Sequence, residues 1–252
     1  MSFRFEAACG CDTGKVRMNN EDNLCFAGEC LEPENNGLQE ILFAEGRSTT
    51  NVCGAIFDGM GGENFGEEAS AAAATGFLRK TALLWTACLT GSAGYLKRLA
   101  LSLNAAVVRK KRMLHTNRMG TTMVATLLGR RYAYFCNIGD SRAYLFREGK
   151  LMQLSQDHVE VIPGRIKTPL TQHLGIEPEY MRIEPYVTKQ KMQPGDRYLL
   201  CSDGLTDMLT DLEIAGILEQ NEDTRNGVRT LIDSALERGG WDNISVILYR
   251  VQ

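Results

Sequence analysis

Short apolar runs alternate with longer amphipathic segments along the chain, and the two patterns separate expected strands from expected helices. Apolar runs of about four to eight residues bounded by turn residues are typical of buried strands, whereas apolar positions three and four residues apart are typical of helices. The pattern predicts strands at residues 3–11, 23–27, 52–57, 120–128, 131–138, 142–146, 150–154, 181–187, 197–202 and 244–251. It predicts helices at residues 65–89, 93–115 and 224–237. This order favours an α+β domain with antiparallel sheets over a repeated βαβ unit.

Two segments lack either pattern. Residues 28–50 are polar and rich in acidic residues, with turn-forming residues near position 35, and are interpreted as a long hairpin or loop insertion. Residues 157–175 are predicted to be irregular because they contain prolines and no sustained periodicity. Neither segment resembles a linker between domains, so the whole chain, residues 1–252, is predicted to form a single domain.

The strand expected at residues 52–57 ends on Asp58, and glycines follow it at positions 59, 61 and 62. A tight turn there would hold the carboxylate at a sheet edge and leave the backbone free to approach a ligand. One such Asp-Gly pair is also typical of an ordinary turn. The pattern recurs, however, because acidic residues beside other apolar runs stand at Glu21, Asp22, Asp140, Asp203 and Asp242. Carboxylates that converge from separate strand ends suit magnesium or manganese better than zinc or copper.

The composition excludes several other classes of protein. A hydrophobic fraction of 44% and a charged fraction of 23% are ordinary for a soluble globular chain, and a net charge of -3 gives no support for a nucleic-acid or anionic-membrane surface. The basic run at residues 109–112 is interpreted as the solvated end of a helix. The sequence predicts neither a membrane span nor a secretory signal. The 8 cysteines lack zinc-site spacing, and most are expected to be small buried residues in a reducing cytoplasm.

Several nucleotide and acyl-transfer motifs are missing from the sequence. The glycines after Asp58 lack the third glycine of a dinucleotide-binding loop, and the chain has no phosphate-binding loop of the nucleoside triphosphatase type. It also has no serine nucleophile elbow. Arg17, close to Glu21 and Asp22, has two interpretations: it forms a salt bridge with these acids, or its guanidinium binds a substrate phosphate with two hydrogen bonds.

The order of the short motifs resembles that of bacterial metal-dependent protein phosphatases of the type 2C class. The motifs are residues 17–22 (RMNNED), 57–62 (FDGMGG), 119–122 (MGTT), 139–142 (GDSR), 156–158 (QDH), 201–205 (CSDGL) and 241–243 (WDN). The resemblance covers nearly the whole chain. It implies a four-layer α-β-β-α sandwich, in which two antiparallel sheets are flanked by helices and a two-metal site lies at one end of the sheets.

The resemblance also assigns the metal ligands. It implies that Asp58 bridges two manganese or magnesium ions and that the carbonyl of Gly59 binds one of them. Asp203 and Asp242 then hold the first ion, and Glu21 reaches the second mostly through water.

The remaining site residues follow from the same resemblance. Asp22 matches a carboxylate of the metal site that orients metal-bound water, and Arg17 matches the arginine that receives the substrate phosphate. Asp140, together with Asp203, matches the residues that hold a third, weaker ion in bacterial members. The implied activity is hydrolysis of phosphoserine and phosphothreonine by a hydroxide bound between the two ions. The implied partners are phosphorylated proteins, the substrates of a serine/threonine kinase.

Two departures from the family pattern affect these expectations. Met60 stands where eukaryotic relatives carry a histidine that serves as a candidate acid for the leaving group, although methionine is usual in the bacterial branch. The flap at residues 159–169 is shorter than bacterial members usually carry, and its Arg165 and Lys167 are expected at the rim of the site. Two alternative functions remain: a catalytically silent regulator that binds phosphoproteins, and a phosphatase of small phosphoesters.

Overall fold

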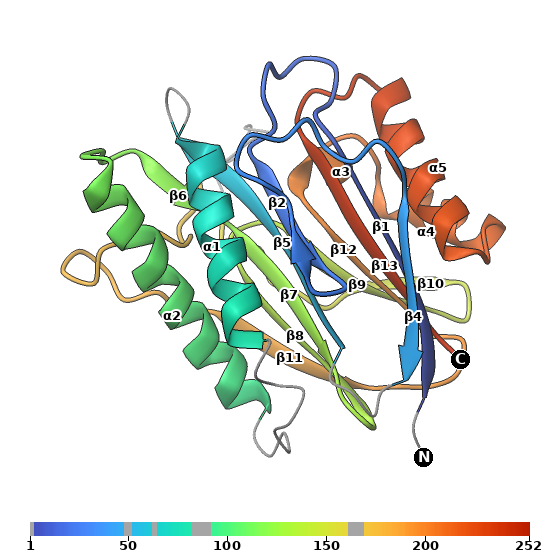
Figure 1. The fold of residues 1–252 in the computed structure, drawn as a ribbon. Helices are drawn as coiled ribbons and strands as arrows, with labels where there is room; N and C mark the ends of the chain where they lie inside the picture. Colours follow the sequence, from blue (N-terminus) through green and yellow to red (C-terminus); the bar gives the residue numbers. More distant parts are fainter. Residues whose placement is uncertain (1–2, 48–51, 62–64, 82–91, 161–168) are drawn as a thin grey trace.

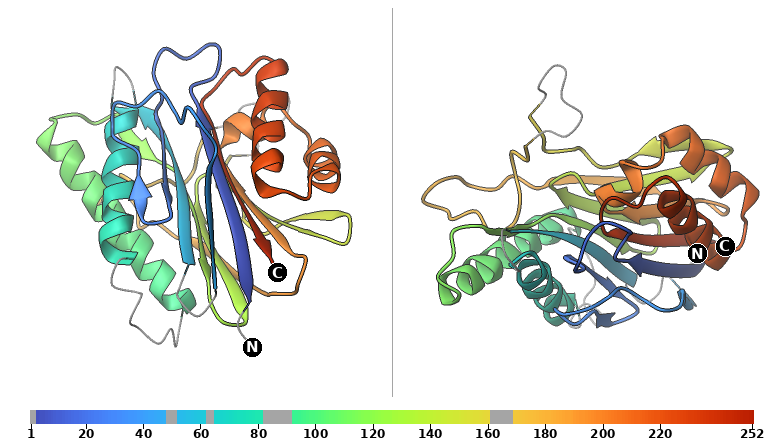
Figure 2. Two further views of the ribbon diagram at one scale, coloured as in Figure 1. Left: turned by 45° about the vertical axis from the view of Figure 1, so that its right-hand side comes forward. Right: turned by 90° about the horizontal axis from the view of Figure 1, so that it is seen from above.

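The computed structural model describes residues 3–47, 52–61, 65–81, 92–160 and 169–252. Two antiparallel sheets lie face to face in the middle of the molecule, with helices on both outer faces (Figures 1 and 2). The predicted four-layer α-β-β-α sandwich is therefore confirmed.

The first sheet is 6-stranded and contains both the first and the last strand of the chain. Its order is β10 (Lys150–Gln153), β9 (Arg142–Arg147), β12 (Arg197–Cys201), β13 (Ile244–Val251), β1 (Arg4–Asp12) and β4 (Leu42–Arg47). The second sheet is 7-stranded, with the order β11 (Tyr186–Lys191), β8 (Tyr132–Ile138), β7 (Met123–Leu128), β5 (Val52–Gly61), β2 (Asp22–Phe26) and β3 (Glu29–Cys30). The short strand β6 (Met119–Thr121) also pairs with β5.

Three apolar clusters separate the four layers. The helices α1 (Gly66–Thr81) and α2 (Ser92–Met113) pack on the outer face of the second sheet through residues such as Phe77 and Leu103. Phe135 and Tyr198 belong to the cluster between the sheets. The helices α3 (Asp203–Thr206), α4 (Asp211–Gln220) and α5 (Thr224–Glu237) cover the first sheet. Burial of these faces supplies most of the driving force for folding.

Most expected elements are present, but the strand that leads to Asp58 differs from its prediction. The expected turn after residue 57 is wrong, because β5 continues through Asp58 to Gly61. The extra length is stabilised by pairing with β6, in which Met60 lies opposite Gly120. Glycine is disfavoured in strands, so the glycines at positions 59 and 61 favour a turn over this continuation. Asp58 is therefore held by a regular ladder and not by a flexible loop.

The interpretation of residues 28–50 as a hairpin or loop insertion is also wrong in part. Within this segment β4 joins the edge of the first sheet and pairs with β1, with Ala44 opposite Ala7. All of its side chains are exposed or half-buried, and the apolar run at residues 41–44 has only the minimum length for an expected strand. Edge strands of this kind give a weak sequence signal, because only one side is paired and little of the surface is buried.

The second half of the chain holds further corrections. The strand expected at 181–187 lies later, at Tyr186–Lys191, and the helices α3 and α4 were missed. The start of α4 carries a capping box, in which the Thr210 hydroxyl accepts from the Glu213 N–H and the Glu213 carboxylate accepts from the Thr210 N–H. This Thr-x-x-Glu signature was present in the sequence. Residues 82–89 of the first expected helix lie outside the described residues, and among the described helices none is long and apolar enough to span a membrane.

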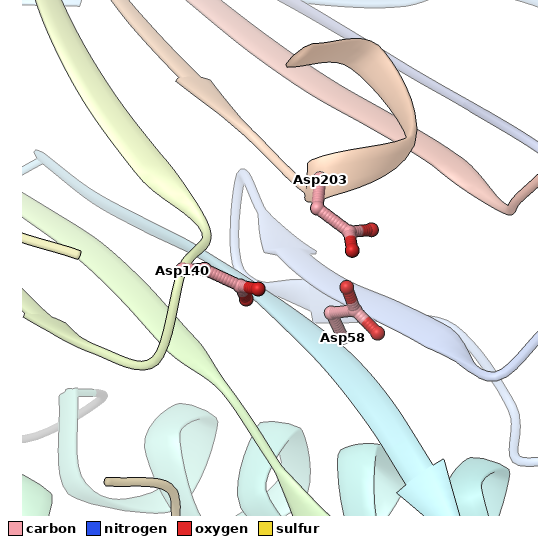
Figure 3. A group of neighbouring side chains, drawn as sticks. All are labelled: Asp58, Asp140 and Asp203. Carbon is pink, nitrogen blue, oxygen red and sulfur yellow. The ribbon is translucent and has the colours of Figure 1, made fainter. Parts of the chain in front are cut away.

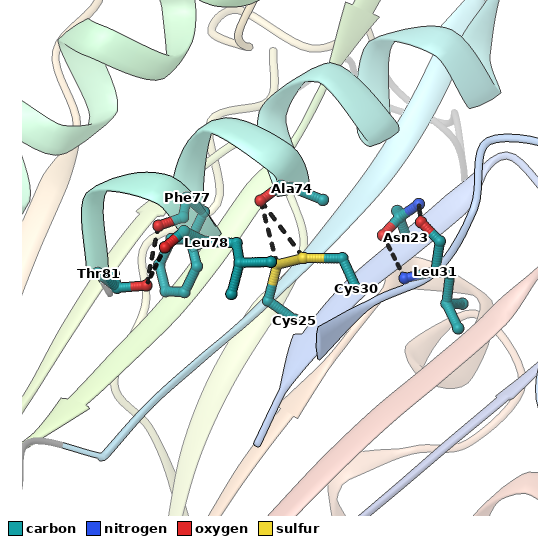
Figure 4. The surroundings of a disulfide bond; sticks show 8 residues. All are labelled: Asn23, Cys25, Cys30, Leu31, Ala74, Phe77, Leu78 and Thr81. Carbon is teal, nitrogen blue, oxygen red and sulfur yellow. Dashed lines mark hydrogen bonds between the residues drawn. A yellow bond between two sulfur atoms is a disulfide. The ribbon is translucent and has the colours of Figure 1, made fainter. Parts of the chain in front are cut away.

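The cysteine prediction is wrong for one pair. Cys25 on β2 and Cys30 on β3 lie opposite each other in the ladder and are joined by a disulfide (Figure 4). Both sulfurs lie under α1, 3.3 and 3.4 Å from the carbonyl oxygen of Ala74. Cysteines 9, 11, 53, 136 and 201 are unpaired. The disulfide fixes the turn that follows β2, the strand whose first residue is Asp22.

Candidate metal centre

Three carboxylates that are far apart in the sequence meet where the two sheets end. Asp58 lies on β5, Asp140 in the turn between β8 and β9, and Asp203 at the start of α3. One carboxylate oxygen from each lies within 4.8 Å of the others (Figure 3). The predicted convergence of these aspartates is therefore seen in the geometry, and their hard oxygen atoms are suitable ligands for a divalent cation.

Hydrogen bonds fix the backbone of Asp58 on both sides. Its N–H donates to the Thr122 hydroxyl (3.1 Å), and its carbonyl accepts from the Thr122 N–H (2.8 Å) and the Thr121 hydroxyl (2.8 Å). The Thr122 hydroxyl in turn lies 2.7 Å from that of Ser141, next to Asp140. The MGTT and GDSR motifs thus connect two of the clustered aspartates through hydroxyl groups.

The glycines around Asp58 allow three chain segments to approach closely. A Cβ atom on Gly59 would lie 2.2 Å from the carbonyl oxygen of Gly66 and 2.5 Å from that of Glu21. A Cβ atom on Gly66 would lie 2.4 Å from the carboxyl carbon of Glu21. Since contacts this short do not occur, any side chain at either position would displace Glu21 or the start of α1. Gly59 itself follows Asp58 directly on β5 and donates its N–H to the Glu21 carbonyl.

Asp22 extends the acidic cluster from the neighbouring strand. It lies opposite Asp58 in the β2–β5 ladder, is 1% exposed, and accepts a hydrogen bond of 2.8 Å from the Ser202 hydroxyl. Burial raises its pKa well above the ordinary value, the nearby Asp203 and Asp242 raise it further, and hydrogen bonds from Ser245 and Ser202 oppose the shift. Asp22 is therefore close to two predicted metal ligands, Asp58 on β5 and Asp203 at the start of α3.

Arg17 and Asp242 form an ion pair at the edge of this cluster. The guanidinium donates to the Asp242 carboxylate at 2.7 Å, and the Arg17 side chain is 48% exposed. The salt-bridge interpretation named Glu21 and Asp22 as partners, but the observed partner is Asp242. The hydrogen bond to Asp242 raises the pKa of Arg17, and the charges of Asp242 and Glu21 also raise it. Since the guanidinium stays half-exposed, it is accessible to an anion.

The electrostatics of the cluster favour a bound cation. Burial raises the pKa of Asp58 well above its ordinary value, and the charges of Asp203, Asp22, Asp140 and Asp242 raise it further. Burial and the charge of Glu67 likewise raise the pKa of Glu21 to about 7. Negative charge thus accumulates where little water can screen it, and a dication held by these oxygens would offset the repulsion. The donor set fits manganese or magnesium.

Asn243 is a positioning residue whose role sequence reasoning missed. Its amide oxygen accepts from the Glu21 N–H (2.8 Å), and its amide nitrogen donates to the carbonyls of Thr13 (2.8 Å) and Asn19 (3.0 Å). It therefore ties the loop that carries Arg17 to the strand that follows Asp242. The residue belongs to the WDN motif, but no sequence pattern shows which backbone groups a buried amide will bind.

The QDH motif supports the turn that carries Asp140. The Arg142 guanidinium binds the Asp157 carboxylate with two nitrogens, and the His158 N–H donates to the carbonyl of Gly139 at 3.0 Å. The Asn137 amide donates to the carbonyl of Gln156 at 2.7 Å. Through these contacts the motif holds the turn that carries Asp140 in place. Arg165 and Lys167, expected at the rim, lie outside the described residues.

We predict that manganese stabilises the protein more at pH 8 than at pH 5. A carboxyl group whose pKa is raised by folding stabilises the fold below its ordinary pKa, and this contribution is lost as the pH rises through the folded value. For Glu21 this window runs from 4.5 to about 7. In chelator the melting temperature should therefore fall across this range, and bound cations should offset the fall.

Thermal melts at both pH values, with manganese and with chelator, measure this effect. The Glu21→Gln variant carries no titrating group at this position, so its melting temperature in chelator should fall less between pH 5 and pH 8. An equal fall in the variant and the unmodified protein would contradict the assignment of this pH dependence to Glu21.

A two-sheet sandwich with a carboxylate cluster at the strand ends defines a candidate site for divalent cations, and comparisons with known proteins specify the family. The sequence model described as "Protein phosphatase 2C" matches residues 38–234. The chain therefore belongs to the protein phosphatase 2C family, and it is a serine/threonine protein phosphatase of this metal-dependent type.

Individual relatives agree with this assignment. The chain is 32% identical to the serine/threonine phosphatase stp of Listeria welshimeri over 257 aligned positions, covering 94% of this chain and 92% of the relative. It is 33% identical to the serine/threonine protein phosphatase PstP of Mycobacterium tuberculosis, covering 94% of this chain but 43% of that longer protein. A structure of the PstP catalytic domain in complex with 2 manganese ions superposes with a TM-score of 0.80 at 28% identity, covering 100% of this chain and 99% of that one.

Proposed function

We propose that this chain hydrolyses phosphoserine and phosphothreonine in proteins with the help of two manganese or magnesium ions. The observation that carries the proposal is the convergence of Asp58, Asp140 and Asp203 within 4.8 Å. Asp22, opposite Asp58 on β2, and Asp242, next to Arg17, extend the same acidic surface. The proposed catalytic domain comprises residues 1–252, because both the first and the last strand of the chain belong to one sheet.

We assign the metal site to carboxylates from both sheets. Asp58 would contribute to holding both ions, with the Gly59 carbonyl as a further ligand. Asp203 and Asp242 would hold the first ion, and Glu21 would hold the second mostly through water. Bound there, two cations would supply a water of lowered pKa as the nucleophile at neutral pH and would offset the charge of the phosphate. Asp140 lies beside Asp203 and, with it, would hold a third, weaker ion.

The chain's own residues would bind and orient the substrate. Arg17 carries N–H donors only, so it would bind the phosphate oxygens and not a cation. Asp22 is buried and held by Ser202, a suitable position for a carboxylate that accepts a proton from water and orients it. Met60 has no proton to donate, so protonation of the leaving serine or threonine oxygen would depend on water.

Hydrolysis assays separate the proposal from its two alternatives. The unmodified protein is incubated with manganese and either phosphoserine and phosphothreonine peptides or a chromogenic phosphate ester. We expect both to be hydrolysed, and excess chelator to stop both reactions. Peptides that bind without turnover would instead support a silent regulator, and turnover of small esters alone would support a small-molecule phosphatase. The physiological substrates are expected to be products of a serine/threonine kinase.

A further inference from the structure

A second hollow lies next to the carboxylate cluster on the same face of β5. Side chains two residues apart on a strand point to the same face, so Asp58 and Met60 project together. Met60 lines a pocket of about 460 Å³ whose floor is formed by β5 and β6. Two strand residues span about 7 Å, so Met60 lies about 7 Å along β5 from Asp58. The pocket is therefore within reach of any peptide bound at the metal centre.

The walls of this pocket come from the end of α2 and from the segment that follows residue 168. Lys111 on α2 and Arg118 just after it line one wall. His173, Gly175 and Glu177 line the opposite wall. In Figure 1 this second segment runs beside α2, and hydrogen bonds from Asn104 to the Ile176 carbonyl (2.8 Å) and from Lys111 to the Gly175 carbonyl (3.3 Å) join the two. The walls are thus fixed by contacts within the protein.

The charge of the pocket is opposite to that of the metal site. Glu177 is its acidic lining residue, and that carboxylate is already bound by Arg112 at 2.8 Å. Among the ion pairs formed within the described part of the chain, none includes Lys111 or Arg118. Two positive charges therefore line the pocket outside these ion pairs: Arg118, and Lys111, whose ammonium also donates to the Gly175 carbonyl. An acidic metal site adjoins a basic pocket along one strand.

We propose that this pocket is a subsite for an anionic side chain that flanks the phosphorylated residue of the substrate. An extended peptide advances about 3.3 Å per residue, so a side chain two or three positions from the phosphoresidue would reach Lys111 and Arg118. The anion is an aspartate or glutamate carboxylate, or a second phosphate. This inference rests on the proposed phosphopeptide hydrolysis and defines which peptides that site prefers.

The test compares kcat/KM for a set of phosphopeptides that differ at one flanking position. Aspartate, a second phosphoserine or alanine is placed two or three residues before or after the phosphorylated serine. For the unmodified enzyme we expect a preference of about fivefold for an anionic residue at one of these positions, the upper end of what an exposed ion pair contributes. A larger factor for phosphoserine than for aspartate would identify a second phosphate as the better ligand.

Variants then assign the preference to the pocket. In the Lys111→Ala/Arg118→Ala double variant the preference should disappear through a higher KM for the anionic peptides. Two single variants are compared as well: Arg118→Lys, which keeps the positive charge, should retain most of the preference that Arg118→Ala loses. Arg98→Ala is the matched control, since Arg98 is exposed on the same helix about 20 Å from Lys111. The preference should also weaken at high salt, because exposed charges are screened.

The possible failures are distinguishable. If all phosphopeptides are hydrolysed with equal efficiency, or the preference survives in the double variant, the subsite is wrong and the proposed function stands. If no phosphopeptide is hydrolysed while the chromogenic ester is, the proposed function and the subsite are both wrong. The ester is measured in parallel for every variant to report whether the metal centre is intact.

Discussion

Replacing Asp58 with asparagine should lower kcat/KM on a chromogenic phosphate ester by at least about a thousandfold. The amide has the shape of the carboxylate but no negative charge, so it cannot bridge two dications. Stabilisation of transition-state charge by metal ions is worth several kcal/mol, and about 4 kcal/mol corresponds to a thousandfold change in rate. Steady-state kinetics with a manganese titration measure the effect.

The same substitution should not unfold the protein. Burial raises the pKa of Asp58, and the charges of Asp203, Asp22 and Asp140 raise it further, so the ionised carboxylate destabilises the metal-free fold at neutral pH. Asp58→Asn should therefore raise the melting temperature in chelator while it removes activity. Asp233→Asn, a change of the same chemistry at an exposed position on α5, is the control and should alter neither. Near-normal turnover of Asp58→Asn in saturating manganese would contradict the assignment.

The site was largely predictable because its acids stand beside short apolar runs. Asp58 and Asp203 each follow an apolar run directly, and in the fold one lies on β5 and the other begins the short helix after β12. Sequence order supplied the family resemblance, but it did not supply the distance of 4.8 Å within which the oxygens meet. That proximity depends on two sheets closing against each other, which no local pattern encodes.

Several of the errors share a physical cause, because they concern contacts between segments distant in sequence. The continuation of β5 past Asp58 depends on pairing with β6, and β4 is a strand only because β1 provides its partner. The three hydrogen bonds of Asn243 and the ion pair of Arg17 likewise join the two ends of the chain. Propensity is a weak predictor wherever such tertiary contacts decide the conformation.

The second large effect is expected for Arg17→Ala, which should lower kcat/KM on small phosphoesters by about a hundredfold. Removing one donor that stabilises negative charge in a transition state typically lowers the rate by about a hundredfold or more, and the Arg17 guanidinium would be such a donor for the phosphate. The loss should appear mainly as a higher KM if Arg17 binds ground-state phosphate, and mainly as a lower kcat if its contact forms only in the transition state. Arg17→Lys should recover part of the rate, because lysine keeps the charge without the planar fork.

The ion pair with Asp242 makes the metal affinity of this variant the decisive measurement. Arg17 donates to the Asp242 carboxylate at 2.7 Å, so it competes with a cation for one of the proposed ligands. If Arg17 serves the phosphate, its removal should leave manganese affinity unchanged or slightly higher, because a repelling positive charge is gone. If Arg17 instead holds Asp242 in place for the metal, affinity should fall together with activity. Calorimetric titration of manganese into Arg17→Ala, with Asp242→Asn as the reference for a lost ligand, separates the two, and a matching loss of affinity would contradict the phosphate-binding role.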